Sequence, residues 1–234
     1  MAHEHRKAFL GGFCMILLLL LTISLLIPAG SLEPDCSESY RTGIFYQRLR
    51  NVELTGDSRT DIIRVAMSQI GYIEGNSSTQ LSGCVAGNKN YTEYGLWYDG
   101  VYGPGGFQKA AWCAMFVSWC AQQAGIPEDI FYQHAYTPYG VNWYSDRGLS
   151  YTRAQIENGA YVPQPGDLVY FLSPGVNRKV NHVGLVLKYE DGILYAIEGN
   201  TNAGDRSTDG GQVCLKSYEN TDTFIRYICT PQYE

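Results

Sequence analysis

The spacing of apolar positions predicts a helix near the start of the folded region. Between residues 57 and 71, apolar side chains recur at intervals of three to four positions. Asp57-Ser58-Arg59-Thr60 supplies residues that cap a helix N-terminus, and Gly71 is suited to end the helix. The pattern indicates an amphipathic helix with one face against a core.

A second helix is predicted over 111–124. From Trp112 to Cys120 the sequence is apolar almost all round, with Ser118 as the exception. A helix with no polar face belongs in the interior, so we expect this one to be the buried central helix. Gly125 and Pro127 follow it, as they commonly follow a helix C-terminus.

Strands are predicted in the second half of the chain. A turn at 163–167 precedes the first of them. The predicted strands are 168–172, 183–188, 193–197 and 224–229. Helices first and strands later predict an α+β fold with an antiparallel sheet.

The other segments lack a clear period. Residues 32–55 read as a tether, and residues 75–108 as a long loop rich in Gly, Asn, Ser and Tyr. Residues 128–160 are mixed, with a turn at 155–159. We therefore expect a single folded domain over 56–234.

Residues 1–31 have the pattern of a targeting segment. His5-Arg6-Lys7 is followed by an uncharged run over 8–27 and by small residues at 28–31. A run of this length fits either a cleaved signal peptide or an uncleaved membrane anchor. In both cases the rest of the chain is exported, either released by cleavage or held outside a membrane by this segment alone.

Composition narrows the possible partners. The 234 residues carry a formal net charge of -6 with no basic patch, which argues against a nucleic-acid partner. Of the seven cysteines, Cys14 lies in the apolar run; export permits disulfides among the other six, but spacing does not assign their pairing. No Cys-x-x-Cys pair occurs, and His134 and His182 stand apart, so we expect no metal site and no cofactor. We expect a monomer.

The predicted hairpin gathers polar residues on one face. A three-residue loop at 190–192 sets a register that places His182 opposite Asn200 and Gly184 opposite Glu198. Side chains alternate between faces along a strand, so His182, Glu198 and Asn200 should project from the same face. A register shifted by one would separate them.

Cys113, at the start of the buried helix, would meet His182 if the helix packs on that face. Gly184 and Ala196 are small enough there to let a helix approach. A helix N-terminus and a nearby imidazolium both favour a thiolate, and Glu198 would orient the imidazole. The backbone N–H of Cys113 could stabilise an oxyanion.

Several other residues in the same part of the sequence are candidates for the site or for the core. Gln108 is a possible second oxyanion donor. Tyr94, Trp97 and Tyr98 either pack in the core or line a substrate groove. Cys120 reads as a packing residue, and His134 as a surface or substrate-lining residue without a catalytic role.

Four motifs in this order resemble the CHAP domain, the cysteine, histidine-dependent amidohydrolase/peptidase family, over roughly residues 58–229. They are Trp112-Cys113-Ala114-Met115-Phe116-Val117-Ser118, Pro165-Gly166-Asp167-Leu168-Val169-Tyr170-Phe171, Asn181-His182-Val183-Gly184 and Ile197-Glu198-Gly199-Asn200. The resemblance implies a papain-like fold in which the helix bearing the cysteine packs on an antiparallel sheet carrying the histidine and glutamate.

The resemblance also implies an activity. CHAP enzymes cleave amide bonds of bacterial peptidoglycan, as N-acetylmuramoyl-L-alanine amidases or as stem or cross-bridge endopeptidases. By position, Cys113 matches the nucleophile, His182 the general base, Glu198 the orienting residue and Asn200 a polar position beside it. Some relatives bind calcium upstream of the cysteine, but the segment 99–103 has one carboxylate, so we expect none here.

Two alternatives of other classes remain open. One is a wall-binding or scaffold protein that keeps the fold without turnover. The other is a transpeptidase or transamidase that passes the acyl group of a thioester intermediate to an acceptor other than water.

Overall fold

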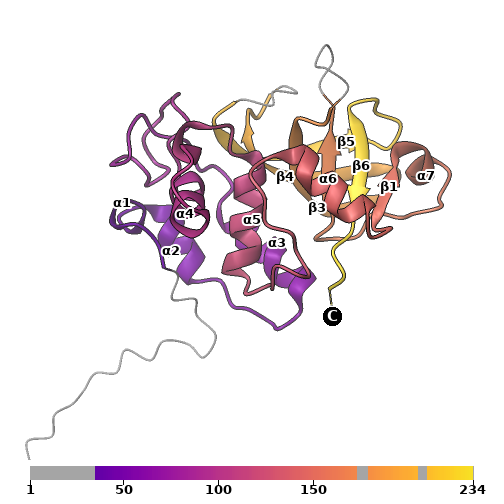
Figure 1. Ribbon diagram of the computed structural model, residues 1–234, viewed down its shortest axis with the longest axis horizontal. Helices are drawn as coiled ribbons and strands as arrows, with labels where there is room; N and C mark the ends of the chain where they lie inside the picture. The colour runs from indigo at the N-terminus through magenta and orange to yellow at the C-terminus, as the bar shows by residue number, and fades with distance from the viewer. Residues whose placement is uncertain (1–34, 173–178, 205–209, 234) are drawn as a thin grey trace, which may run out of the picture.

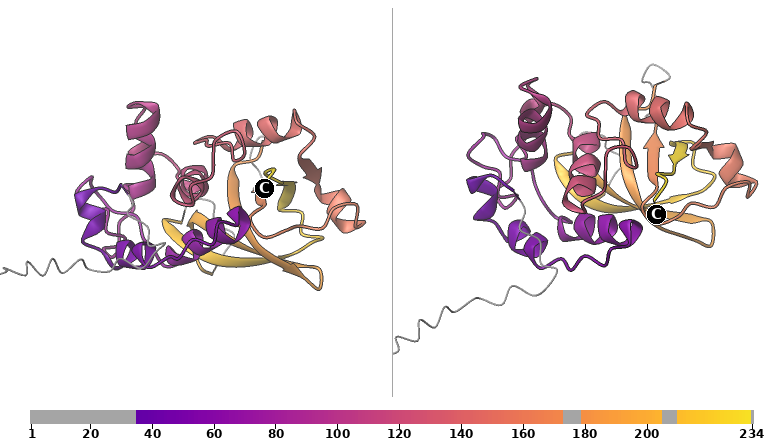
Figure 2. Two further views of the ribbon diagram at one scale, coloured as in Figure 1. Left: turned by 90° about the horizontal axis from the view of Figure 1, so that it is seen from below. Right: turned by 60° about the horizontal axis from the view of Figure 1, so that its bottom comes forward.

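The computed structural model describes residues 35–172, 179–204 and 210–233. Figures 1 and 2 show α1, α2 and α4 at one end of the molecule and the sheet with α6 and α7 at the other, with α3 and α5 between them. The helices are α1 Glu38–Arg41, α2 Ile44–Arg50, α3 Ser58–Ser68, α4 Glu93–Tyr102, η1 Phe107–Lys109, α5 Cys113–Gln123, α6 Thr137–Ser145 and α7 Arg153–Glu157. The strands are β1 Ser150–Thr152, β2 Leu168–Phe171, β3 His182–Glu190, β4 Ile193–Thr201, β5 Gln212–Glu219 and β6 Ile225–Cys229.

Both predicted helices form. The Asp57 side chain accepts the Thr60 backbone N–H at 2.8 Å and so begins α3, while Gly71 takes a left-handed φ of +94° in the turn beyond it. Ten of the eleven residues of α5 are buried. The polar exception, Ser118, donates its hydroxyl to the Ala114 carbonyl oxygen at 2.8 Å, which explains how it is tolerated in the interior.

The sheet is antiparallel throughout, with strand order β1-β6-β2-β3-β4-β5. Its two faces contribute to separate apolar clusters. The main core lies between the sheet and the helices and includes Leu168, Val183, Leu185 and Ile197. The opposite face carries a second cluster that includes Phe171, Val186 and Ala196. The predicted α+β fold with an antiparallel sheet is therefore confirmed.

The β3–β4 hairpin differs from its predicted turn but keeps the predicted register at the functional end. Glu190 pairs with Ile193, so the loop has two residues rather than three. An irregularity between Val186 and Lys188 then moves the pairing by one residue. Beyond it Gly184 pairs with Glu198, as predicted, because the two one-residue errors cancel.

The expected tether is wrong for its described part. Within 35–55 the chain forms α1 and α2, and Tyr40, Phe45 and Leu49 are buried in the main core. Each helix has only one or two turns, and Gly43 lies between them. Such short helices leave no repeated period in the sequence, so the segment looked structureless.

Three further segments hold structure that the sequence analysis did not place. The expected loop at 75–108 contains α4, whose first turn is capped by Thr92 through the Gly95 N–H at 3.0 Å. Residues 128–160 contain α6, β1 and α7, and α7 occupies part of the expected turn at 155–159. Strand β5 was missed because Leu215 is 47% exposed while Lys216 is buried, which inverts the usual alternation.

Within the described ranges, no helix is both long enough and apolar enough to cross a bilayer. The predicted targeting segment over 1–31 lies outside those ranges.

Candidate active site

Cys113 is the first residue of α5 and is 3% exposed. The N-cap residue, Trp112, makes no side-chain capping bond, and the first hydrogen bond of the helix runs from the Phe116 N–H to the Trp112 carbonyl oxygen at 2.9 Å. The N–H groups at the start of the helix therefore have no acceptor within it. They place positive partial charge next to the sulfur.

Trp112 is held on two sides. Its indole Nε1 donates to Glu74 Oε2 at 3.0 Å, and a Cβ added at Gly199 would lie 2.7 Å from Trp112 Cζ3 and 2.8 Å from Phe116 Cβ. Only glycine at 199 therefore lets the first turn of α5 approach β4 this closely. Gly199 performs the role that we predicted for Gly184 and Ala196.

His182 and Glu198 form a buried pair. Their Nε2 and Oε2 atoms lie 2.9 Å apart, and the two side chains are 0% and 1% exposed. The other ring nitrogen, Nδ1, makes no hydrogen bond to a described residue, and interaction with the Cys113 side chain is among the causes that raise the pKa of the ring. Because Nε2 is occupied, Nδ1 is the nitrogen available to the thiol.

The surroundings of His182 favour its charged form. Burial alone lowers the pKa of the imidazole, but hydrogen bonding and charge from Cys113, followed by those from Glu198, outweigh burial and raise it to about 9. An imidazolium is therefore stabilised at neutral pH between a sulfur and a carboxylate.

Gly184 makes room for the carboxylate. A Cβ at Gly184 would lie 2.6 Å from Glu198 Cγ and 3.1 Å from the Ile197 carbonyl oxygen. Because residue 184 has no side chain, the Glu198 side chain has room to extend to His182.

Helix α5 packs on one face of the sheet, and the side chains of His182 and Glu198 lie on the other. We had expected both on the same face. Val183 and Ile197 belong to the core beneath the helices. His182 instead lies beside Phe171, a member of the opposite cluster, with ring centroids 5.7 Å apart. Because His182 is the first residue of β3, Cys113 meets it at the end of the strand and not across the sheet face.

Asn200 is buried two residues after Glu198. Its backbone has a left-handed φ of +58°, and the pairing of β4 with β5 is irregular between Glu198 and Thr201. Simple alternation therefore does not fix the direction of its side chain, so its role in the site remains a prediction.

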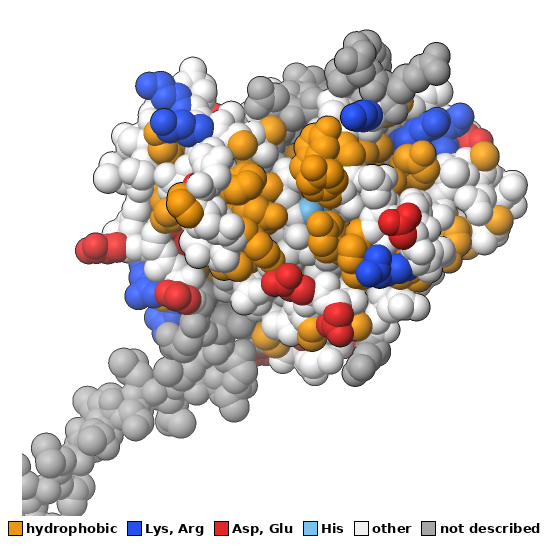
Figure 3. Space-filling view, viewed as in Figure 1, with side chains coloured by type: hydrophobic (Ala, Val, Ile, Leu, Met, Phe, Trp, Pro, Cys, Tyr) orange, Lys and Arg blue, Asp and Glu red, His pale blue; other side chains and the backbone are white. Residues whose placement is uncertain are grey.

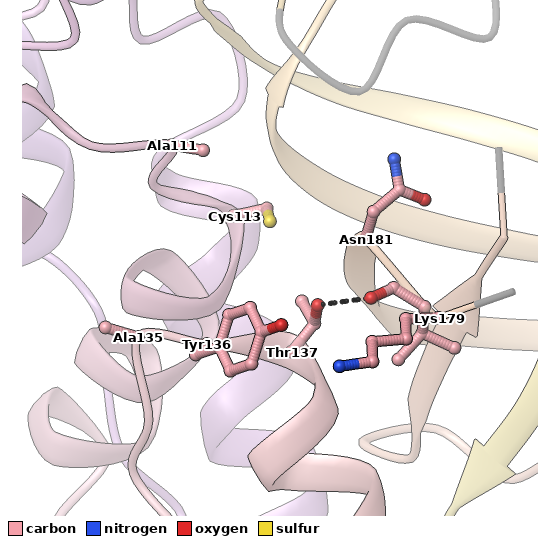
Figure 4. Close-up of a pocket in the computed structure, with 8 residues that line it drawn as sticks. Ala111, Cys113, Ala135, Tyr136, Thr137, Lys179 and Asn181 are labelled. Carbon is pink, nitrogen blue, oxygen red and sulfur yellow. Dashed lines mark hydrogen bonds between the residues drawn. The ribbon is translucent and has the colours of Figure 1, made fainter. Parts of the chain in front are cut away.

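A cavity of about 450 Å³ lies beside Cys113. It is lined by Ala111, Cys113, residues 135–137 around the start of α6, and residues 179–181 before β3. In Figure 4 the sulfur of Cys113 points from the helix toward the segment that carries Asn181. Figure 3 shows a small part of a histidine at the bottom of a hollow between patches of hydrophobic side chains.

The aromatic residues predicted as a possible groove belong elsewhere. Tyr94 is completely buried in the core, with its ring 5.4 Å from that of Trp112, and Tyr98 is 8% exposed in the same core. Trp97 borders a different hollow, beside Cys36 and Glu93. None of the three lines the cavity at Cys113; Tyr94 and Tyr98 pack in the core, and Trp97 packs partly against it.

Gln108 is not among the residues that line the cavity. Its Nε2 is buried without a hydrogen-bond partner in the described part of the chain, and its backbone N–H donates to Asp99 Oδ2 at 3.2 Å. Asp99 also accepts the backbone N–H groups of Gly105 and Phe107, so this carboxylate orders the loop before Gln108. Gln108 as an oxyanion donor remains a prediction.

Two residues that were set aside from catalysis are buried. Cys120 is 0% exposed, and burial raises the pKa of its thiol well above the ordinary range. His134 is 2% exposed, so the expectation of a surface or substrate-lining position is wrong. Its Nδ1 lies 2.9 Å from the Tyr132 carbonyl oxygen and its Nε2 3.0 Å from the Tyr170 hydroxyl, and burial lowers its pKa to about 4.

Tyr136, Thr137 and Lys179 line the cavity, and Glu74 and Gly199 support Trp112; none of these roles was predicted from the sequence. No motif marks the lining residues, because they come from two segments without clear periodicity. Gly199 could have been found, since it lies between Glu198 and Asn200 at a position that faces the helix.

Residues 104–200 match the family model of the CHAP domain. This segment is similar to CHAP domains. It contains Cys113, His182, Glu198 and Asn200, and the CHAP family comprises cysteine- and histidine-dependent amidohydrolases that act on peptidoglycan. The helices and the antiparallel sheet agree with a papain-like CHAP fold.

The other comparisons add little. No curated protein matches the chain significantly. A solved structure titled "The crystal structure of Ly7917" is 13% identical over 74% of this chain, with a TM-score of 0.39. The match covers 62% of that structure's own chain, and likeness at this level carries no argument about fold or function.

Proposed function

We propose that this protein is an exported cysteine hydrolase that cleaves amide bonds of bacterial peptidoglycan. The observation that carries the proposal is the continuous arrangement of Cys113, His182 and Glu198, with the thiol at a helix N-terminus and the imidazole held by a buried carboxylate. These groups are the parts of a nucleophile, its acid–base partner and an orienting residue.

The proposed reaction proceeds through a thioester. The Cys113 thiolate attacks the amide carbonyl carbon, and the backbone N–H groups at the start of α5 stabilise the oxyanion. The imidazolium of His182 gives its proton to the leaving amine, and the C–N bond breaks. Water, deprotonated by His182, then attacks the thioester, releases the carboxylate product and restores the thiol.

Glu198 acts on the reaction through His182. Its carboxylate binds Nε2, so Nδ1 is directed at the sulfur, and its negative charge stabilises the imidazolium that protonates the leaving group. We assign Glu198 a positioning role because it contacts the imidazole and not the thiol. Asn200 is proposed to support the same end of the hairpin.

The substrate class follows from the family. CHAP domains act on wall amides, and the proposed bond lies at the sugar–peptide junction or within the stem and cross-bridge peptides. The apolar run at 8–27 is proposed to direct export, which would place the enzyme outside the cytoplasmic membrane where its substrate is. Cell fractionation should recover the protein with wall or membrane, and recovery in the cytoplasm would refute the export proposal.

The test uses two cysteine variants of the same helix. Purified peptidoglycan is digested with the wild type, Cys113→Ala and Cys120→Ala, and newly released amino groups are counted. We expect wild-type release at a measurable rate, release lowered at least about 1,000-fold in Cys113→Ala, and substantial release in any Cys120→Ala that folds. Release by Cys113→Ala near the wild-type rate would refute the proposal.

The same digests separate the two alternative functions. A wall-binding scaffold would sediment with insoluble wall but release no amino groups. A transamidase would release amino groups and, with an added amine, join that amine to the acyl fragment, which mass spectrometry detects.

A further inference from the structure

The cavity beside Cys113 has donors but no acidic group in its lining. Of the described residues that line it, Lys179 alone is charged, and none is aspartate or glutamate. Tyr136 adds a phenolic hydroxyl and is 49% exposed. A space so lined is suited to an anion and unsuited to a cation.

Among the described residues, the ammonium group of Lys179 has no partner. None of the hydrogen bonds or ion pairs between described residues involves its side chain. In Figure 4 the amino group of Lys179 extends toward Tyr136 and Thr137, and the Tyr136 hydroxyl points into the same space. The two donors come from segments far apart in the sequence and converge on one volume.

The base of the lysine arm is fixed. The Thr137 hydroxyl donates to the Val180 carbonyl oxygen at 2.9 Å, and the Asn181 N–H donates to the Phe171 carbonyl oxygen at 3.0 Å. These bonds tie the residues after Lys179 to α6 and to β2. The charge therefore sits on a flexible arm that starts from an ordered wall of the cavity.

We propose that Lys179, assisted by the Tyr136 hydroxyl, binds a carboxylate of the substrate close to the scissile amide, so that the enzyme selects anionic peptides. This rests on the proposed function, since the amide is the one Cys113 attacks. An ammonium and a hydroxyl are matched to a carboxylate, and charge-assisted hydrogen bonds are the stronger kind. The chain as a whole has a net charge of -6, so a local cation is needed to hold an anion here.

The test compares two soluble stem-peptide fragments of wall that differ only in a free carboxylate or its carboxamide. We expect the full-length wild type to prefer the carboxylate fragment about 10-fold in kcat/KM, which corresponds to about 1.4 kcal/mol. Lys179→Met should bring this ratio close to one by lowering kcat/KM for the carboxylate fragment, and Lys179→Glu should invert it. Lys179→Arg should retain most of the preference, and Tyr136→Phe should reduce it about 3-fold.

Lys188→Met is the matched control. Lys188 is an exposed lysine of β3 that pairs with Glu190 near the hairpin turn, and it does not line the cavity. The Lys188→Met variant should keep the wild-type preference for the carboxylate fragment. Equal cleavage of the two fragments by the wild type, or an undiminished preference in Lys179→Met, would overturn the proposal.

Binding and cleavage are separated with Cys113→Ala. Its dissociation constants for the two fragments should show the same preference, which Lys179→Met in that background should remove. Selective binding without any cleavage by the wild type would retain the role of Lys179 and overturn hydrolysis. Cleavage of both fragments without selective binding or a preference in kcat/KM would retain hydrolysis and overturn the role of Lys179.

Discussion

Single residues around His182 determine both the charge and the position of the proposed site. Two glycines matter here as much as the polar residues do. Gly184 leaves space for the Glu198 side chain, and Gly199 lets the first turn of α5 approach β4. The polar residues then complete a buried line from Cys113 through His182 to Glu198.

The raised pKa of His182 predicts the alkaline limb of activity. With a pKa of about 9, the imidazolium that protonates the leaving amine is present at neutral pH and is lost as pH rises through 9. We expect kcat/KM for wall fragments to fall above about pH 9. Glu198→Gln removes a charge that raises this pKa, so its alkaline limb should lie at lower pH.

The measurement is a pH profile of kcat/KM for the two proteins, with circular dichroism at each pH as a control for folding. An alkaline limb at the same pH in wild type and Glu198→Gln would contradict the role given to the carboxylate.

Gly184 offers a second prediction at this scale. Gly184→Ala places a Cβ 2.6 Å from Glu198 Cγ and should displace the carboxylate from Nε2. We expect kcat to fall about 10-fold or more and the alkaline limb to shift as in Glu198→Gln, with KM less affected.

Gly100→Ala is the matched control, because a Cβ at Gly100 in α4 meets no atom within 4 Å. Wild-type kcat in a folded Gly184→Ala protein would refute the role assigned to this glycine.

At the scale of elements, α5 links the N-terminal helices to the sheet. It packs on β3 and β4 and also contacts α3 and α4. The short helices α1 and α2 complete the same core through Tyr40, Phe45 and Leu49. The segment before α3 is therefore part of the folding unit that positions Cys113.

The contribution of α2 can be measured with two variants of one helix. Leu49 is 0% exposed and Ile44 is 51% exposed. Leu49→Ala should lower the free energy of unfolding by about 3 kcal/mol through lost burial and a residual cavity. Ile44→Ala should change it by less than about 1 kcal/mol.

Chemical denaturation followed by tryptophan fluorescence gives both values. If both substitutions changed the free energy of unfolding by the same small amount, α2 would not belong to the cooperative core. The segment would then contribute no more to stability than a tether does.

The elements differ in how well local sequence predicts them. Helix α5 was predicted because an apolar run with a terminal glycine and proline is a strong signal by itself. The functional end of the hairpin was predicted only because a two-residue turn and a bulge cancelled, and both depend on pairing between strands. The face on which α5 packs was predicted wrongly, since it depends on which of two apolar faces the rest of the chain covers.

For the molecule as a whole, the motifs predicted more of the chemistry than of the substrate cavity. Cys113, His182 and Glu198 could be found because each lies in a recognisable local pattern. Tyr136 and Lys179 could not, because only the folded chain brings the start of α6 beside the segment before β3. Specificity therefore depends on tertiary structure, while the proposed reaction depends on the CHAP motifs.

The central claim is that Cys113 carries the acyl group of a wall amide. The most direct measurement is mass spectrometry of the enzyme quenched in acid during turnover of peptidoglycan fragments, followed by proteolysis and peptide mapping. We predict an added mass, equal to that of the acyl part of the cleaved fragment, on the peptide containing Cys113 and absent in Cys113→Ala. Turnover with that peptide unmodified, or with the adduct on another residue, would contradict the account.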